Sequence, residues 1–255
     1  MNAWPSIRAA DPLLKLARAG GWSPGRILAV MDGYFDESGE HAPGGSLTRL
    51  TVGGFFAPLR EIERLNSKWG VALDAEGLSA FHMKEIASDE GGYPTWAPER
   101  RRRLDRFVDI LCECAAEFGA FSYVPRNPAR AFADAYEPAI SRVMIVAASL
   151  SERTGERGNV VFAQTDEIKQ EMIGRYFDRL RWAEWLDGYS VLSSRHSPAL
   201  QAAEIVARGL KRVMQDGGVT QSFAKILTAG KPCRFWPEQP LAAAGFAPRL
   251  LGVVP

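Results

Sequence analysis

The sequence predicts an α/β layer fold, in which strands and helices alternate along one large domain. Short apolar runs bounded by glycine, proline or acidic residues recur along the chain, and runs of this length are typical of buried strands. The segments between them carry apolar residues at steps of three and four positions, the pattern of a helix with one buried face. This alternation favours a sheet covered by helices. The length of 255 residues is sufficient for one large domain with additions.

Two strands and a helix are expected first. Apolar and aromatic residues fill 27–35 and predict a strand that ends at Asp36. Glycine and proline within 39–45 allow a turn into a second strand over 47–57. The spacing of apolar residues then predicts a helix over 59–74.

The later elements follow from similar signals. Proline suits the first turn of a helix, glycine marks a helix C-terminus, and serine caps a helix N-terminus. With these markers the sequence predicts a strand leading into a turn at 78–86, a helix at 98–118, a strand at 121–124, a helix at 128–154, a strand at 160–162, a helix at 167–182, a strand at 189–192 and a helix at 198–214 capped by Ser197.

The elements divide the chain into three parts. Residues 1–30 contain the Gly20-Gly21 and Pro24-Gly25 breaks and are expected to form an N-terminal extension ahead of the core pattern. Residues 31–216 hold the alternating elements and form the domain. Residues 217–255, rich in glycine, proline and alanine, are expected to be an irregular C-terminal tail.

Composition narrows the class of protein. A net charge of +1 means that any nucleic-acid contact must come from a local patch. Three cysteines argue against a disulfide framework and favour a reducing cytoplasm. No stretch reaches about 18 consecutive apolar residues, so we expect no membrane span. The sequence therefore predicts a cytoplasmic protein without a membrane partner.

Two carboxylates follow the first predicted strand, in Phe35-Asp36-Glu37-Ser38-Gly39. A carboxylate at the end of a central strand is held on a rigid platform, as in many acidic metal sites for phosphodiester chemistry. Aspartate is also common in turns, where it bonds to the backbone. Asp36 and Glu37 are therefore either site residues or turn residues.

Three further acidic residues lie near element ends. Glu85 follows the strand predicted at 78–86, Asp166 follows the strand at 160–162, and Glu204 lies within the last helix. Carboxylates that end neighbouring parallel strands emerge on the same edge of a sheet, and a helix packed across that edge can add another. We therefore expect Asp36, Asp166 and Glu204 to converge and bind Mg²⁺ or Mn²⁺, with Glu85 as a fourth catalytic candidate.

Asp166, Glu204 and Glu85 also have purely structural interpretations. Asp166 can cap the helix that begins at residue 167. Glu204 can form a surface ion pair with Arg208, one turn further along the helix. Glu85 can simply be solvated.

Histidines and arginines supply further candidates. A histidine such as His82 on a mixed apolar segment is more often structural than a ligand or base, and His196 is expected to lie nearer to Glu204 than His82 does. Arg100 to Arg103, with Arg106, form the densest positive patch. Because they point around most of a helix, some must be solvated or paired with neighbouring acids, and the alternative is a role in following phosphates.

The opening Phe35-Asp36-Glu37-Ser38-Gly39 and the closing helix Leu200-Gln201-Ala202-Ala203-Glu204 together resemble a bacterial family catalogued as domain of unknown function thirty-eight hundred. Its members open with Asp-Glu-Ser-Gly and close with Leu-Gln-x-Ala-Asp, and the resemblance covers about residues 31–211. It implies a ribonuclease H-like mixed sheet with helices on both faces for the domain at 31–216. It also implies Asp36, Asp166 and Glu204 as the site carboxylates, although Glu204 stands where the family usually has aspartate.

These observations favour a divalent-metal-dependent nuclease or related phosphodiester-cleaving hydrolase, with nucleic acid as its partner. A catalytically inactive ribonuclease H-like binding or regulatory module, linked to mobile elements or phage defence, is the alternative. A third interpretation is a metal-free hydrolase that acts on sugars with two carboxyl groups.

Overall fold

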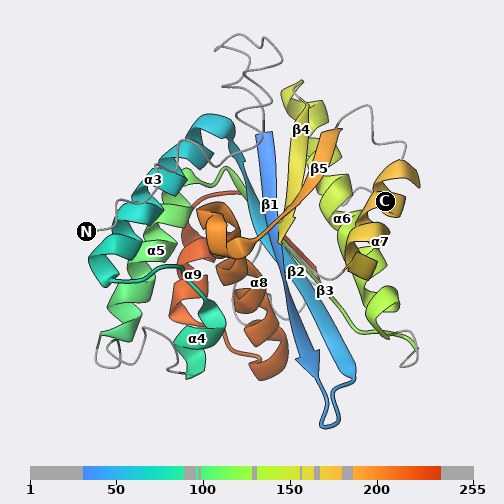
Figure 1. The fold of residues 1–255 in the computed structure, drawn as a ribbon, viewed down its shortest axis with the longest axis horizontal. Coiled ribbons are helices and arrows are strands. Elements are labelled where there is room, and N and C mark those ends of the chain that lie inside the picture. Colours follow the sequence, from blue (N-terminus) through green and yellow to red (C-terminus); the bar gives the residue numbers. More distant parts are fainter. Residues whose placement is uncertain are drawn as a thin grey trace.

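A six-stranded mixed β-sheet forms the centre of the described part of the chain (Figure 1). The computed structural model describes residues 31–88, 96, 99–127, 131–155, 157–163, 167–179 and 186–236. The strands are ordered β5-β4-β1-β2-β3-β6 across the sheet. They comprise β1 (Met31–His41), β2 (Leu47–Pro58), β3 (Glu117–Tyr123), β4 (Gly158–Ala163), β5 (Leu186–Leu192) and β6 (Cys233–Trp236).

Both strand orientations occur in this sheet. β1, β2 and β3 form an antiparallel meander, and the first hairpin turns through Gly44 and Gly45, whose φ angles of 101° and 86° favour glycine. β4 pairs parallel to β1, β5 pairs parallel to β4, and β6 pairs parallel to β3. The predicted α/β class is confirmed. β1, β4 and β5 thus run in the same direction and end towards the same edge.

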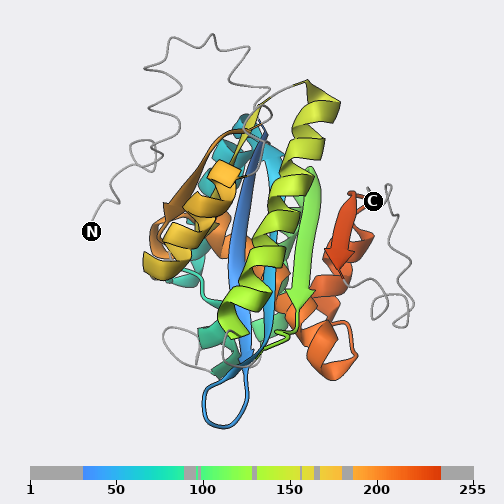
Figure 2. The ribbon, with the colours of Figure 1, turned by 90° about the vertical axis from the view of Figure 1, so that its right-hand side faces the viewer.

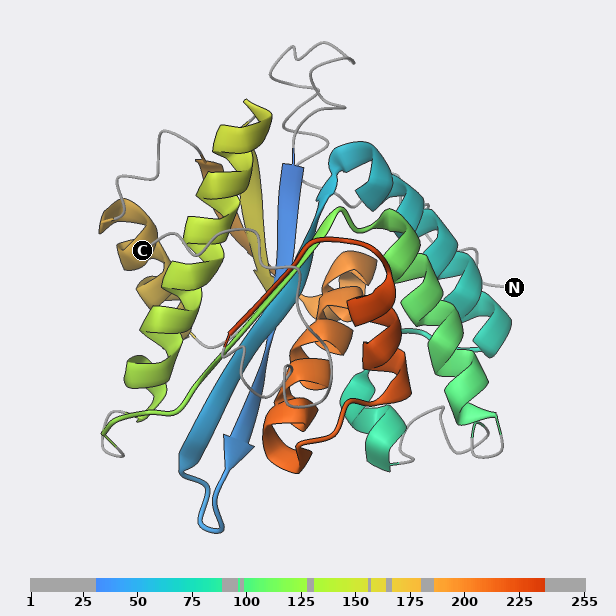
Figure 3. The same ribbon diagram turned by 180° about the vertical axis from the view of Figure 1, so that it is seen from behind.

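Helices cover both faces of the sheet, as Figures 1 and 3 show. One face carries α3 (Leu59–Glu76), α4 (Met83–Ser88), α5 (Arg100–Cys114), α8 (Pro198–Asp216) and α9 (Gln221–Thr228). The other carries α6 (Ala131–Thr154) and α7 (Glu167–Arg179), and Figure 2 shows α6 lying along the sheet. Successive β1 side chains alternate between the two cores: Tyr34 packs on the α8 side and Phe35 on the α6 side.

The closing helix α8 packs unusually close to the sheet. Ser197 caps it by accepting a 3.3 Å hydrogen bond from the Leu200 amide, as predicted. A Cβ atom placed on Gly53 of β2 would lie 2.6 Å from the Cα of Ala207. Only glycine at position 53 and small residues on α8 allow this approach, so the register of the helix over β1 and β2 is tightly fixed.

The prediction of a strand at 78–86 is wrong. Residues 78–82 are irregular and α4 follows at Met83–Ser88. Phe81 is nevertheless fully buried, with its ring 5.4 Å from that of Trp69 and 4.7 Å from that of Phe107. The apolar residues of this run are buried by an aromatic cluster rather than by a sheet, and a short apolar run alone does not separate these outcomes.

The prediction of an irregular tail from residue 217 is also wrong, because part of this range forms α9 and β6. Thr220 caps α9, and β6 lies beside β3 at the sheet edge (Figure 2). The buried carboxylate of Glu117 binds Arg153 at 2.7 Å and also pairs with Arg234 of β6. A four-residue strand anchored by tertiary ion pairs leaves little periodic signal in the sequence.

Smaller differences concern element ends. The helix predicted to continue to residue 118 ends at Cys114, where Ala115 adopts an extended conformation, and β3 then begins at Glu117. Residues 1–30 and 237–255 lie outside the described residues, and so do the first residues of the strand predicted from residue 27. Among the described helices, none combines the length and apolar character needed to cross a membrane.

Candidate functional site

Asp36 occupies the middle of the sheet, at the point where one of its neighbours stops. The parallel pairing of β1 with β4 ends at Phe35 and Phe162, one residue before Asp36. β1 itself continues to His41 because it stays paired with β2, so the expectation that the strand ends at Asp36 is wrong. At Asp36, β1 is therefore paired with β2 on one side, while its pairing with β4 on the other side has already ended.

Glu204 of α8 lies over Asp36 because of the close helix packing. Asp36 is the register partner of Gly53, and Ala207 of α8 rests on Gly53. Glu204 lies about one helical turn before Ala207 and is half-buried in a stretch where both neighbouring residues are buried. Two carboxylates far apart in sequence are thus brought within electrostatic range of each other.

Burial and mutual repulsion disfavour the ionised form of Asp36 in this pair. Burial and then the negative charge of Glu204 raise the pKa of Asp36 to about 8, despite the 2.7 Å hydrogen bond that its Oδ1 accepts from the Glu37 amide. Asp36 is therefore mainly protonated at neutral pH in the absence of a bound cation. The Oε2 atom of Glu204 is buried and accepts no hydrogen bond from the described residues. Both features indicate that the negative charge of the pair is only partly compensated within the described residues.

A pocket of about 470 Å³ opens beside Glu204. His82 and Glu85 line it from the region of α4, and Arg195 lines it from the short helix η5 (Ser194–His196) that follows β5. The Nδ1 atom of His82 lies 3.8 Å from Oε2 of Glu204, which is an ion-pair contact but too long for a hydrogen bond. This interaction with Glu204 raises the pKa of His82. The pocket therefore presents acids, a histidine and a cation around one carboxylate.

Gln201 holds the walls of this pocket together. Its Oε1 accepts from Trp69 Nε1 at 2.9 Å and from the Phe81 amide at 3.0 Å. Its Nε2 donates to the carbonyl groups of Ser194 at 2.9 Å and Arg195 at 3.3 Å. One buried amide therefore fixes the residue before His82 and the backbone of η5 to the helix that carries Glu204. Nothing in the sequence analysis assigned Gln201 a role, although a glutamine within an apolar helical run is a usable signal.

The predicted site residues have different outcomes. Asp36 and Glu204 are brought together, and Glu85 lies in the same pocket, although on α4 rather than after a strand. Asp166 lies outside the described residues. The expectation that His196 lies nearer to Glu204 is not met, because His82 makes the ion-pair contact with it.

The donor set suits a divalent cation. Within the described ranges, no three His, Cys, Asp or Glu side chains are grouped so that they could hold a metal ion. Mg²⁺ needs only one or two protein carboxylates, since water and substrate complete its coordination. Asp36 and Glu204 provide two carboxylates, and Oε2 of Glu204 is a buried acceptor that forms no hydrogen bond within the described residues. The residues present therefore fit Mg²⁺ or Mn²⁺ bound between them.

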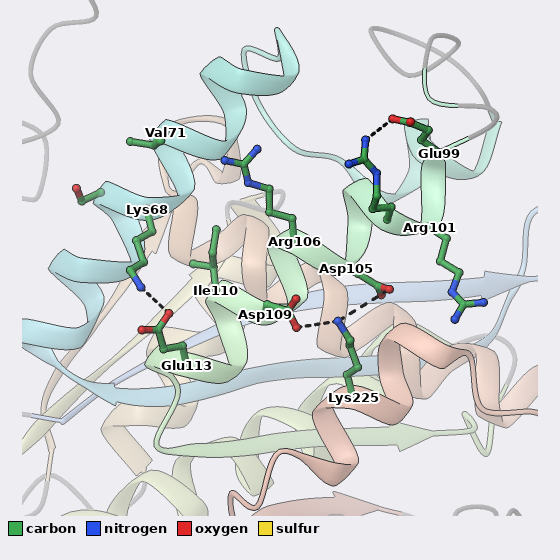
Figure 4. Close-up of a pocket in the computed structure, with 12 residues that line it drawn as sticks. Lys68, Val71, Glu99, Arg101, Asp105, Arg106, Asp109, Ile110, Glu113 and Lys225 are labelled. Carbon is green, nitrogen blue, oxygen red and sulfur yellow. Dashed lines mark hydrogen bonds and ion pairs between the residues drawn. The ribbon is translucent and has the colours of Figure 1, made fainter.

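A larger pocket of about 980 Å³ lies between α3, α5 and α9, on the arginine-rich surface (Figure 4). Its charges are largely neutralised in pairs. Lys68 binds Glu113 at 2.5 Å and Lys225 binds Asp109 at 2.8 Å. In the arginine cluster, carboxylates pair with Arg102, Arg103 and Arg106. This favours the paired interpretation of the cluster over a role in following phosphates.

Comparison with known proteins adds no assignment: no family model, no curated protein and no solved structure matches the chain. Function must therefore be inferred from the geometry of the pocket itself.

Proposed function

We propose that this protein is a divalent-metal-dependent phosphodiester-cleaving enzyme, a nuclease of ribonuclease H-like fold. The observation that carries the proposal is the electrostatic interaction between Asp36, whose pKa is raised, and Glu204, whose Oε2 is buried and accepts no hydrogen bond from the described residues. His82 is the only cation in ion-pair contact with this carboxyl pair within the described residues, and binding a divalent cation would relieve the repulsion that raises the pKa of Asp36.

The fold supports the same proposal. Strands β3-β2-β1-β4-β5 form a mixed sheet with helices on both faces, as the resemblance to the ribonuclease H-like family implies, and β6 extends it. The acidic pair lies at the edge where β4 and β5 end, which is where ligands bind in sheets of this type. We include Asp166, which lies outside the described residues, as a third ligand because the resemblance to this family implies it.

The residues of the chain would divide the work as follows. Asp36 and Glu204 bind the cation, and His82 holds the Glu204 carboxylate in place through its ion-pair contact. Arg195, on the pocket wall, offers a positive charge to a phosphate group. When bound, Mg²⁺ or Mn²⁺ would polarise the phosphoryl oxygens and lower the pKa of a coordinated water.

The inactive-module alternative receives less support. A salt bridge from Arg208 or Lys211 across the acidic pair would have favoured a closed, catalytically silent site. Lys211 instead donates a 2.6 Å hydrogen bond to the Gly39 carbonyl, and in the described part of the chain Arg208 forms no ion pair with Glu204. Glu204 therefore faces the pocket without a salt bridge to Arg208 or Lys211.

A second candidate function rests on the same raised pKa. Asp36, with its raised pKa, and the neighbouring carboxyl group of Glu204 resemble the carboxyl pair of a metal-free hydrolase that acts on sugars. The two functions differ in their response to a chelator. Metal-dependent activity disappears with EDTA and returns with Mg²⁺ or Mn²⁺, whereas a carboxyl-pair hydrolase is insensitive to both.

The test is cleavage of labelled single-stranded and duplex RNA and DNA, with Mg²⁺, Mn²⁺ or EDTA. We expect cleavage only with metal, and its loss in Asp36→Asn and Glu204→Gln. Glu63→Gln, on the exposed face of α3, is the matched control for the second variant and should retain full activity. Absence of cleavage with every substrate and metal, or cleavage that survives both site substitutions, would refute the proposed function.

A further inference from the structure

The helix α8 reaches the protein surface along one narrow stripe. Between Ala199 and Leu210 every residue is buried except Glu204 and Arg208. Lys211 and Arg212 continue the same side at steps of three and four, which places them on one face of the helix. We call Glu204, Arg208, Lys211 and Arg212 the α8 stripe. It begins in the acidic pocket and continues as three cations.

None of these three cations forms an ion pair within the described residues, although Glu204 lies near Arg208 and Glu40 lies near Lys211. In the ranges that the structure describes, neither Arg208 nor Arg212 forms an ion pair, and Lys211 bonds only to a backbone carbonyl. Glu40, on the adjacent β1, is paired with Arg49 at 3.4 Å. Burial is the main cause that lowers the pKa of Lys211, and the neighbouring charges of Arg208 and Arg212 add to it. A bound polyanion would remove this repulsion.

We propose that the α8 stripe binds the sugar–phosphate backbone of a nucleic-acid strand and leads it to the carboxylate pair. This inference rests on the proposed function, since a nucleic-acid strand bound along α8 would be cleaved at the carboxylate pair. Eight residues separate Glu204 from Arg212, a rise of about 12 Å along the helix. That length matches about three phosphates of one strand, at roughly 3.4 Å each along a duplex axis.

The α8 stripe differs from the arginine-rich surface of α5 in how many of its cations are paired with carboxylates. Carboxylates on neighbouring residues pair with Arg102, Arg103 and Arg106, so much of that surface charge is neutralised. The α8 cations are fewer, but they form no ion pair within the described residues and lie on the same helix as Glu204. Electrostatic binding of phosphates depends on charge available for counter-ion exchange rather than on the number of arginines.

The experiment measures binding of a fluorescent 15-nucleotide single-stranded DNA by anisotropy, in EDTA so that no cleavage occurs, over a range of salt concentrations. We compare the parent protein with Arg208→Gln/Arg212→Gln. Each lost phosphate contact lowers the slope of log affinity against log salt by about 0.7 for a single strand, so the double variant should lose about 1.4. We expect its affinity at low salt to fall by about tenfold or more.

Three controls make the result decisive. Arg101→Gln/Arg102→Gln, on α5, removes the same formal charge and should leave the slope unchanged. Arg208→Lys/Arg212→Lys keeps the charge and should restore most of the slope, which separates charge from folding. Asp36→Asn should bind at least as tightly as the parent, so that failure of the metal site and failure of the stripe are distinguishable.

Three outcomes would overturn the inference. The first is that the parent does not bind the DNA, and the second is that the α8 and α5 double variants lose equal affinity. The third is that vesicles of phosphatidylserine bind the stripe while DNA does not, which would assign it to a membrane surface instead.

Discussion

Replacing Asp36 with asparagine should stabilise the metal-free protein at neutral pH. Asparagine keeps the shape of the side chain and can still accept the hydrogen bond from the Glu37 amide. It removes the group whose ionisation burial and Glu204 oppose. A substitution in the middle of a central strand is normally destabilising, so a gain in the free energy of unfolding would be a specific signature of the strained carboxyl pair.

The sign and size of the effect follow from the pKa. An aspartate with a pKa of 3.8 when unfolded and about 8 when folded holds a proton in the folded state that the unfolded state lacks over that interval. The stability that this proton provides is complete below about pH 4 and is lost as the pH rises to about 8. At pH 7, about 3.2 units above the unfolded pKa of 3.8, holding this proton lowers the free energy of unfolding by on the order of 4 kcal/mol. Partial access to solvent screens some of it, so we expect a gain of about 2–4 kcal/mol.

Urea denaturation in EDTA at about pH 5, 7 and 9 measures this effect. The parent protein should lose stability from the lowest to the highest pH relative to Asp36→Asn, and the difference between the two proteins should grow accordingly. Asp74→Asn, at an exposed position of α3, is the matched control and should change stability by less than about 0.5 kcal/mol. If Asp36→Asn is less stable than the parent at pH 7, or if the two proteins share the same pH dependence, the assignment of a buried proton to Asp36 is wrong.

Two further substitutions test how the pocket is held. Gln201→Leu leaves two buried donors and two partly buried carbonyl groups without their partner and should lower the free energy of unfolding by roughly 3–5 kcal/mol in a denaturation experiment. A loss below about 1 kcal/mol would show that water replaces the amide. Gly53→Ala places a methyl group against the backbone of α8 and should cost about 1–3 kcal/mol while weakening metal binding. Gly218→Ala, whose added methyl meets open space, is its control, and equal effects of the two would contradict the close packing.

The sequence predicted the sheet class and the acidic strand because both depend on local patterns. The apolar run before Asp36 and the capped helix from Ser197 are strong local signals. The helix begins where expected, whereas β1 is a strand that continues to His41, past the predicted end at Asp36. The strand expected at 78–86 failed because burial of Phe81 depends on an aromatic cluster drawn from distant helices. β6 was missed because its position depends on Glu117, far away in the sequence.

The candidate site was predictable only in part, for a related reason. The acidic residues could be identified by their position after apolar runs or within a small-residue helix. Which histidine approaches Glu204 depends on Gln201, whose four hydrogen bonds link segments that no sequence spacing connects. The depth of the Asp36 carboxyl group likewise depends on the contact between Gly53 and α8, which becomes visible only in three dimensions.

The most direct test of the central claim is titration of the protein with Mn²⁺ by isothermal calorimetry at pH 7, in buffers of different ionisation enthalpy. Because Asp36 is mainly protonated in the free protein, a cation that binds the Asp36–Glu204 pair must displace its proton. We predict binding accompanied by the release of about one proton per ion. Binding and proton release should both be lost in Asp36→Asn. If Mn²⁺ does not bind, or if it binds Asp36→Asn as tightly as the parent and releases as many protons, the carboxylate pair is not a metal site.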